Sequence, residues 1–274
     1  MSRILAFLKS CTPPIMLHAM RQIRSNRIVF EGNYASWEDA ATKCGGYNAE
    51  HILTKVLEST LKVKRGDAIF ERDSVLFDEI EYSWPLLAGL MWAAARNGGK
   101  LNVLDFGGAL GSHYFQNRQF LHDLSEIRWN VVEQSHYVLA GQKHIQSDHL
   151  RFYSSIDDCL AESQPNVILL SSVLQYLQSP DEIISLLAGV GASVLIIDRT
   201  PFSASAMDRL AIQNVPASIY SASYPMWIFS GARFEKKLAK NWNMITRTLS
   251  LEGCLQTTAG FEFCFQGMIL ETRR

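Results

Sequence analysis

The sequence predicts an α/β protein with a doubly wound, largely parallel sheet. Between Lys100 and Arg199, short apolar runs recur at intervals of 20 to 40 residues, with helical stretches between them. This alternation is typical of repeated βαβ units, whose parallel strands are covered by helices on both faces. The five runs are LNVLDF, IRWNVVE, LRFYS, NVILLS and SVLIID.

The segments on either side complete the predicted organisation. Apolar runs over 244–251 and 261–270 are expected to pair as a C-terminal hairpin at the sheet edge, after a helix at about 232–241, which gives seven strands in all. Residues 1–99 are interpreted as a basic arm and a helical cap, because residues 35–97 carry helical spacing without strand-like alternation. Residues 100–274 then form the sheet domain, with an aromatic, proline-containing insertion at 213–230.

The composition indicates a packed globular protein and excludes several classes. The 274 residues are 47% hydrophobic and 19% charged, as in ordinary folded domains, and a net charge of -1 gives no field for holding nucleic acid. Five scattered cysteines without a C-x-x-C pair predict neither a disulfide framework nor a zinc site, and they favour a reducing cytoplasm. No apolar run reaches the roughly 18 residues that span a bilayer, and the first residues do not resemble a signal peptide.

Charge is distributed unevenly along the chain. Residues 1–30 carry five basic side chains and no acidic one, which leaves the remainder at -6. A basic, mildly amphipathic end of this kind is one means of peripheral contact with an anionic membrane surface, and the alternative is a simply solvated arm.

The stretch VLDFGGALG ends the first predicted strand and precedes a helix. Its glycines, Gly107, Gly108 and Gly111, allow the turn to approach a nucleotide-type ligand without side chains. Asp105 places a carboxylate beside the turn, which suits a cationic or hydrogen-bond-donating ligand and would repel a pyrophosphate. A nicotinamide dinucleotide is therefore disfavoured, and a tight turn without any ligand is the alternative.

Acidic and polar residues end the following strands. Glu133 ends the second strand, 28 residues after Asp105, where a carboxylate can accept both hydroxyls of a ribose; a solvated strand end is the alternative. Gln134 is placed to contact an adenine edge. Ser155 and Ser171, after the third and fourth strands, are further candidates for cofactor binding, although an N-cap role is the alternative for Ser155.

The combination of Asp105, the glycine-rich turn and Glu133 resembles the class I S-adenosylmethionine-dependent methyltransferases. The resemblance implies a Rossmann-like sheet of seven strands with the last antiparallel, and S-adenosylmethionine as the cofactor. Ala109 stands where that family usually has its middle glycine, which is tolerable if the backbone there keeps an ordinary φ. Longer segments look like methyltransferases encoded among bacterial surface-polysaccharide genes of the O-antigen type, which implies a sugar or glycan precursor as acceptor: FERDSVLFDEIEYSWPLL, SSVLQYL, IIDRTPF and YPMWIFS.

Methyl transfer requires alignment of donor and acceptor, and a base only when the acceptor is a hydroxyl. His113 and Asp198 are the candidate catalytic residues, and the alternatives are an exposed helix start for the first and an ion pair with Arg199 for the second. Serine rather than aspartate ends the fourth strand, so no metal site is expected. Further candidate bases lie in the flanking segments: Glu71, Asp73, Tyr82 and Tyr224.

Candidate acceptor-binding residues are Arg72 and Tyr82 in the cap, and Tyr224 and Trp227 in the insertion. A surface ion pair is the alternative for Arg72, and core packing is the alternative for the aromatic residues. The sequence thus predicts a metal-independent methyltransferase for a small polar acceptor. The competing interpretation is a non-catalytic module of the same fold that partners glycan-biosynthesis enzymes, with Ala109 marking a damaged cofactor turn.

Overall fold

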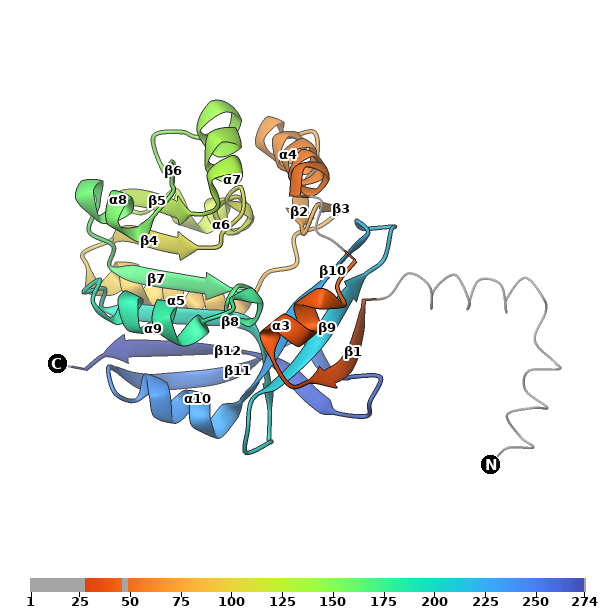
Figure 1. Ribbon diagram of the computed structural model, residues 1–274. Helices are drawn as coiled ribbons and strands as arrows, with labels where there is room; N and C mark the ends of the chain where they lie inside the picture. The colour runs from red at the N-terminus through yellow and green to blue at the C-terminus, as the bar shows by residue number, and fades with distance from the viewer. Residues whose placement is uncertain (1–27, 46–48, 274) are drawn as a thin grey trace, which may run out of the picture.

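A path of seven strands forms the centre of the structure, a computed structural model that describes residues 28–45 and 49–273 (Figure 1). The parallel strands run in the order β6, β5, β4, β7, β8; β12 then pairs antiparallel with β8, and β11 with β12. This confirms the predicted sheet and its C-terminal hairpin, and the order is typical of the class I methyltransferase fold. The strands are β4 (Lys100–Phe106), β5 (Glu126–Val132), β6 (Leu150–Tyr153), β7 (Val167–Ser171), β8 (Val194–Ser203), β11 (Trp242–Gln256) and β12 (Glu262–Thr272).

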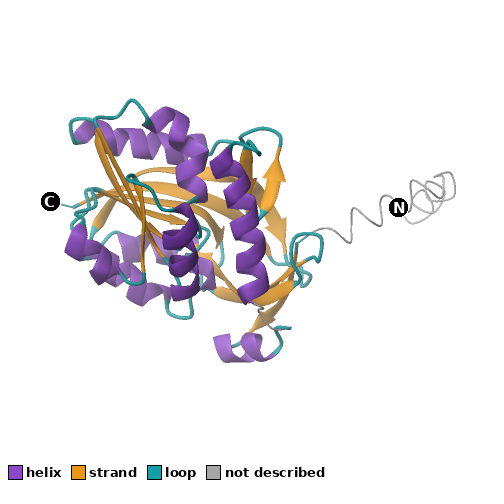
Figure 2. Ribbon diagram, turned by 90° about the horizontal axis from the view of Figure 1, so that it is seen from above, coloured by secondary structure: helices purple, strands orange, loops and turns teal. Residues whose placement is uncertain are grey.

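Helices cover both sides of this sheet, as Figure 2 shows. The parallel strands can therefore be apolar on both faces, and β7 is buried at every position. A π-helical turn at Gly141–Ile145 follows α7, and a single 3-10 turn at Leu174–Tyr176 follows β7. The helices around the sheet are α4 (Ala49–Arg65), α5 (Trp84–Arg96), α6 (Ser112–Leu121), α7 (Ser135–Ala140), α8 (Ile156–Glu162), α9 (Pro180–Ala188) and α10 (Gly231–Leu238).

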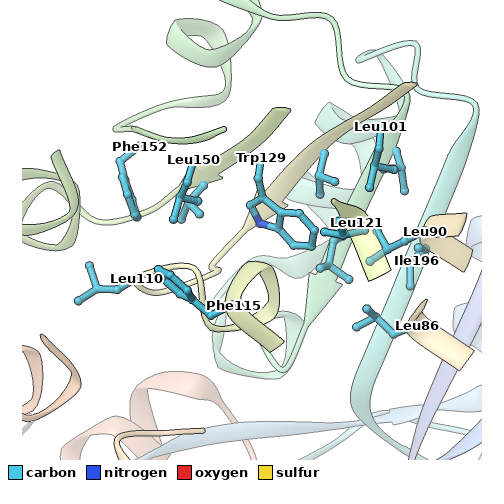
Figure 3. Packing of buried hydrophobic residues seen from close by; sticks show 14 of the residues in the cluster. Leu86, Leu90, Leu101, Leu110, Phe115, Leu121, Trp129, Leu150, Phe152 and Ile196 are labelled. Atoms are coloured by element: carbon cyan, nitrogen blue, oxygen red, sulfur yellow. The ribbon is translucent and has the colours of Figure 1, made fainter. Parts of the chain in front are cut away.

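Alternate side chains of each strand enter one of two hydrophobic layers. Val103 of β4 belongs to the layer that contains residues of α4, α5, α6 and α7, and Leu104 belongs to the layer covered by α8, α9 and α10. Trp129 of β5 is fully buried in the first layer, among Leu121 of α6 and other large side chains (Figure 3). The two layers fix β4, whose carboxyl end carries the glycine-rich turn.

Three further strands extend the sheet beyond the seven expected. β1 (Val29–Tyr34), β9 (Arg209–Val215) and β10 (Ala222–Ser230) form an antiparallel group, and the end of β10 pairs with the end of β8. The aromatic insertion is therefore a β-hairpin, and the segment before the cap enters the sheet through β1. The short helix α3 (Trp37–Thr42) contacts β9 and β10 and begins at the N-cap Ser36.

The cap contains a small β-hairpin as well as the expected helices. β2 (Phe70–Arg72) and β3 (Val75–Phe77) pair on either side of Asp73 and Ser74, whose φ angles are 52° and 68°. Positive φ at both central residues matches the twist of a two-residue hairpin turn. The prediction that residues 35–97 contain no strand is wrong here, because strands of three residues are too short to show alternation.

A disulfide joins Cys254 to Cys264 across the β11–β12 hairpin, which the cysteine spacing did not predict. The two residues are direct partners in the strand register, and register cannot be obtained from spacing alone. Cys44 and Cys159 are free. Cysteine usage therefore no longer favours a reducing compartment.

Two expectations concerned membranes. Within the described residues, no helix has both the length and the apolar character needed to cross a bilayer. The basic arm at residues 1–27 lies outside the described part of the chain, so its contact with a membrane surface stays a prediction.

Candidate functional site

Two cavities meet at the carboxyl ends of β4, β7 and β8. The smaller, which we call the glycine cleft, has a volume of about 100 Å³ and lies between the glycine-rich turn, the start of α6 and the β2–β3 hairpin. The larger, the tyrosine cavity, has a volume of about 570 Å³ and is bounded by the β1–β9–β10 group and by the β2–β3 and β11–β12 hairpins. Ligand groups in the two cavities would be neighbours, because both cavities are lined by Arg72, Asp73, Ser172 and Arg199.

Close packing holds the glycine-rich turn against the sheet. Gly107 has a φ of 74°, in the region that favours glycine, and a Cβ built on it would lie 2.4 Å from Val173 Cγ2. A Cβ built on Gly108 would lie 2.4 Å from Asp105 Cγ, and one on Gly111 would lie 2.9 Å from a methyl group of a neighbouring leucine. The glycines are therefore required by contacts within the protein, although Gly107 and Gly108 also line the cleft.

Asp105 lies beneath this turn. Its side chain is 1% exposed, and its Oδ2 accepts a hydrogen bond of 2.8 Å from the indole N–H of Trp129. Burial raises the pKa of Asp105 to about 6, and His113 and the Trp129 bond oppose the rise. Asp105 does not line the cleft, so the predicted direct contact with a cofactor finds no support in this geometry.

Left-handed backbone is concentrated at the same place. Ala109 has a φ of 49°, so the condition under which alanine would be tolerated at this position, an ordinary φ, is not met. Among the described residues other than glycine, five have positive φ, and four of these line the glycine cleft: Asp73, Ala109, Ser172 and Arg199. Strained backbone of this kind clusters at functional sites, where the surrounding structure enforces it.

Glu133, immediately after β5, folds back onto neighbouring backbone. Its Oε2 accepts a hydrogen bond of 2.6 Å from the N–H of Gln134. Burial raises the pKa of Glu133, and the N–H groups of Gln134 and Ala109 partly offset this rise. A carboxylate has about four acceptor positions, so these bonds leave capacity for ribose hydroxyls.

The remaining predicted cofactor residues are spread more widely. Gln134 is the exposed residue before α7. Ser155 caps α8 by accepting a hydrogen bond of 3.0 Å from the N–H of Asp158. This is the N-cap role that was the alternative interpretation of Ser155. Ser171 ends β7 and lines the glycine cleft, and its buried hydroxyl has no hydrogen-bond partner. Of these three, Ser171 alone reaches the cleft.

Glu71 of β2 faces the glycine cleft from the hairpin side. It is 2% exposed; its Oε1 accepts a hydrogen bond from the Ser112 hydroxyl, and its Oε2 has no partner. Burial raises the pKa of Glu71 to about 7, and the Ser112 bond opposes this rise while Asp73 adds to it. Ser74 and Thr60 are close enough to Glu71 to lower its pKa, but neither forms a hydrogen bond with its Oε2.

An ion-pair network borders both cavities. Arg199 Nη2 lies 2.9 Å from Asp73 Oδ2, and Arg199 Nε lies 2.6 Å from Glu252 Oε1. The Arg199 guanidinium holds the pKa of Asp73, whose side chain is 55% exposed, below its ordinary value. The two carboxylates likewise raise the pKa of Arg199 in spite of its burial. Asp73 and Arg199 are therefore both charged at neutral pH.

The two predicted catalytic residues occupy different surroundings. His113 lines the glycine cleft with its Nδ1 3.0 Å from Gln116 Oε1, and burial lowers the pKa of His113 against the opposing effect of Asp105. The ring is therefore neutral at pH 7 and can accept a proton. Asp198 instead accepts a hydrogen bond of 3.2 Å from Ser250 and lines neither cavity. The structure does not bring Asp198 to the site.

Two of the four predicted acceptor-binding residues line a cavity. Arg72 borders both cavities and also pairs with Glu81 at 3.0 Å, as its alternative reading expected. Tyr224 lines the tyrosine cavity, and its hydroxyl accepts a hydrogen bond of 3.3 Å from Gln213.

The other two lie elsewhere. The ring of Tyr82 packs on that of Trp84 at 5.0 Å, and Tyr82 lines neither cavity. Trp227 stacks on Trp37 at 6.0 Å and donates a hydrogen bond of 3.1 Å to the Leu177 carbonyl. Trp227 and Tyr224 are three positions apart in β10, and a strand places residues at odd separations on opposite faces. Trp227 is therefore not a wall of the tyrosine cavity.

The sequence did not single out the remaining polar residues of the tyrosine cavity. The Tyr176 hydroxyl donates to Gln213 Oε1 at 2.9 Å, and the Tyr176 ring meets that of Tyr224 edge-on at 5.0 Å. Burial raises the pKa of both tyrosines, so they stay protonated at neutral pH. The position of Tyr176 just after a strand end was the signal that could have indicated it. In the part of the chain that is described, no three His, Cys, Asp or Glu side chains gather as a metal site.

No protein-family model and no curated protein shows a significant match to this chain. Solved structures match it at low similarity. The N-terminal domain of EvdMO1, in the presence of S-adenosylhomocysteine and D-fucose, is 11% identical, with 83% of this chain and 98% of that chain covered and a TM-score of 0.46. The N-methyltransferase NodS from Bradyrhizobium japonicum WM9, in complex with S-adenosylhomocysteine, is 16% identical over 81% and 100% of the two chains, with a TM-score of 0.40. A pericyclic reaction enzyme is 12% identical over 82% and 66%, with a TM-score of 0.40. Similarity at this level is no evidence for the activity of this chain, so its function has to be inferred from its own site.

Replacing Ala109 by glycine should stabilise the fold. Glycine adopts positive φ without steric cost, so Ala109→Gly should raise the free energy of unfolding by about 1 kcal/mol. Urea unfolding measures the change. Ala95→Gly, in an exposed position of α5, is the matched control, and its free energy of unfolding should fall by about 1 kcal/mol. A loss of stability in Ala109→Gly would contradict the left-handed assignment.

The stability of Glu71→Gln relative to the wild type should depend on pH. The folded pKa of about 7 lies above the ordinary 4.5, so the folded state binds this proton more tightly and the wild type loses stability as pH rises between these values. The amide side chain of the variant cannot ionise. Between about pH 4 and pH 8, the free energy of unfolding of the variant should therefore rise by up to about 3 kcal/mol relative to that of the wild type, because one pKa unit corresponds to about 1.4 kcal/mol. Urea unfolding at each pH tests this, and a constant difference would show that the pKa of Glu71 is not raised.

Proposed function

We propose that this chain is an S-adenosylmethionine-dependent methyltransferase for a small polar acceptor, a sugar or glycan precursor. The observation that carries the proposal is the junction of the glycine cleft with the tyrosine cavity at the carboxyl ends of the parallel strands. Open α/β sheets bind their ligands outside these strand ends. One cavity suits part of a methyl donor, and its neighbour suits the group that receives the methyl.

The residues around the glycine cleft fit one end of this cofactor. A volume of about 100 Å³ is below the roughly 300–1,000 Å³ of whole ligand sites, so the cleft would take only part of the molecule. The buried, unpartnered Glu71 Oε2 and Ser171 hydroxyl are polar groups that lack a partner within the protein. Glu133, which follows β5 and is not among the residues that line the cleft, keeps acceptor capacity for ribose hydroxyls. When bound, S-adenosylmethionine supplies an electrophilic methyl group on a positively charged sulfur.

The tyrosine cavity supports a neutral, hydroxylated acceptor. Its Arg199 is already paired with Asp73 and Glu252, so an ionic acceptor would have to break these ion pairs. Phenol and amide groups of Tyr176, Tyr224 and Gln213 can exchange hydrogen bonds with hydroxyls. Aromatic side chains combine a large apolar surface with a polar handle, which suits the apolar face of a sugar ring.

The protein's contribution to this reaction is alignment, exclusion of water and removal of one proton. Arg72, Asp73, Ser172 and Arg199 line the boundary at which the two ligands would meet. His113, neutral at pH 7, is the proposed proton acceptor on the cleft side of this boundary. We propose no divalent metal, because β7 ends in serine where such a metal would need a carboxylate.

The left-handed φ of Ala109 favours one alternative, a non-catalytic module that partners glycan-biosynthesis enzymes. Titration with S-adenosylhomocysteine separates the two functions. Saturable binding supports the enzyme, and the absence of binding at millimolar ligand supports the module.

Removing the Glu133 carboxylate should weaken cofactor binding. A hydrogen bond to a charged group contributes about 1.5–3 kcal/mol, so Glu133→Ala should lower the affinity for S-adenosylhomocysteine by about 10- to 100-fold in calorimetry. Glu126→Ala, at the other end of β5, is the matched control and should bind as the wild type does. Unchanged binding by Glu133→Ala, together with a lower melting temperature, would assign Glu133 a structural role.

Tyr224→Phe should affect the acceptor and leave the cofactor unchanged. The substitution removes one hydroxyl from the tyrosine cavity, so kcat/KM for the accepted member of a panel of uncharged sugars and glycan precursors should fall by about two- to tenfold. Its affinity for S-adenosylhomocysteine should stay at the wild-type value. Tyr34→Phe removes a hydroxyl from β1, outside both cavities, and serves as the control. A Tyr224→Phe protein with full kcat/KM would place the acceptor elsewhere.

A further inference from the structure

Glu71 combines features that a purely structural carboxylate rarely has. Its side chain is nine-tenths or more buried, its Oε1 accepts a hydrogen bond from Ser112, and its Oε2 has no partner. It lines the glycine cleft together with Gly107 and Gly108. Buried carboxylates are normally paired or fully hydrogen-bonded, because an unpaired one costs free energy. The free oxygen is therefore a position for a donor that is not part of the protein.

The charged surroundings of Glu71 do not supply that donor. Arg199 is committed to Asp73 and Glu252, and the next residue of β2, Arg72, pairs with Glu81. A cation entering the cleft would thus meet an unneutralised carboxylate. The titratable or charged groups that face Glu71 from the packed elements are Asp73 in the β2–β3 turn, Arg72 in β2, His113 in α6 and Arg199 in β8.

We propose that Glu71 receives the primary ammonium group of the cofactor's amino-acid part through Oε2. This inference rests on the proposed use of S-adenosylmethionine. An ammonium group carries a positive charge and three N–H donors, whereas the sulfonium has no donor and the cofactor's own carboxylate would be repelled. Glu71 does not line the tyrosine cavity, so the acceptor is not its partner. Glu71 is therefore a binding residue for the cofactor, which excludes its sequence-based assignment as a base for the acceptor.

A consequence of this assignment is coupling between cofactor binding and a proton. Burial holds the pKa of Glu71 at about 7 in the free protein, and an ammonium partner favours the charged form. Below this pKa, binding would release a proton, so affinity should rise with pH and level off above it. A ligand without the amino group has no such partner and should show no comparable rise.

The test uses calorimetry of the full chain with S-adenosylhomocysteine and with its deamino analogue, in which hydrogen replaces the amino group. The wild type should prefer S-adenosylhomocysteine by about tenfold or more at about pH 8. Glu71→Gln should reduce this preference to about threefold or less by weakening S-adenosylhomocysteine alone. Glu58→Gln, an exposed position of α4 in the same cap, should keep the wild-type preference.

Two results would overturn the assignment. Retention of the full preference by Glu71→Gln, or equal weakening of both ligands, would give Glu71 a purely structural role. If Glu71→Gln fails to fold, the wild type alone still tests the inference. Its preference for S-adenosylhomocysteine over the deamino analogue should increase between about pH 5.5 and pH 8.5, and a constant preference would reject the inference. Failure of the wild type to bind S-adenosylhomocysteine at all would reject the proposed function itself.

Discussion

The ion pairs of Arg199 connect three parts of the molecule that are far apart in sequence. Asp73 belongs to the cap hairpin, Arg199 to β8, and Glu252 to the β11–β12 hairpin. The Arg199 side chain is 17% exposed, so its removal would leave two carboxylates close together without their cation. The same residue has a left-handed φ of 50° and borders both cavities. The relative placement of the two cavities therefore depends on this side chain.

Much of the fold could be predicted because its elements have local signals. The parallel strands are buried on both faces and appear as continuous apolar runs, and the glycine-rich turn is visible as a motif. β1 pairs with β9, which lies about 180 residues later in the chain, and no local pattern indicates such a partner. The Cys254–Cys264 disulfide depends on strand register in the same way.

The candidate site was predictable to a smaller extent. Sequence position places Gly107, Gly108 and Ser171 at strand ends, and these residues do line the cleft. For two other candidates, side-chain orientation determined whether they reach a cavity. Trp227 lies on the opposite face of β10 from Tyr224, and Asp198 faces Ser250 rather than a cavity. Glu71 is distinguished by its burial, its free Oε2 and its raised pKa, which are all properties of the folded structure. From the sequence alone, Glu71 could therefore be named only as one of several acidic candidates.

The two cavities also differ in how much of the chain is needed to build them. The residues that line the glycine cleft extend from Phe70 to Arg199, whereas those of the tyrosine cavity extend from Ile28 to Phe265. Contacts between distant segments require closure of longer loops, which costs more conformational entropy. During synthesis from the N-terminus, every wall residue of the glycine cleft is present before β12 has been made, while the tyrosine cavity still lacks Phe265. The tyrosine cavity is therefore the later of the two to be completed on a growing chain.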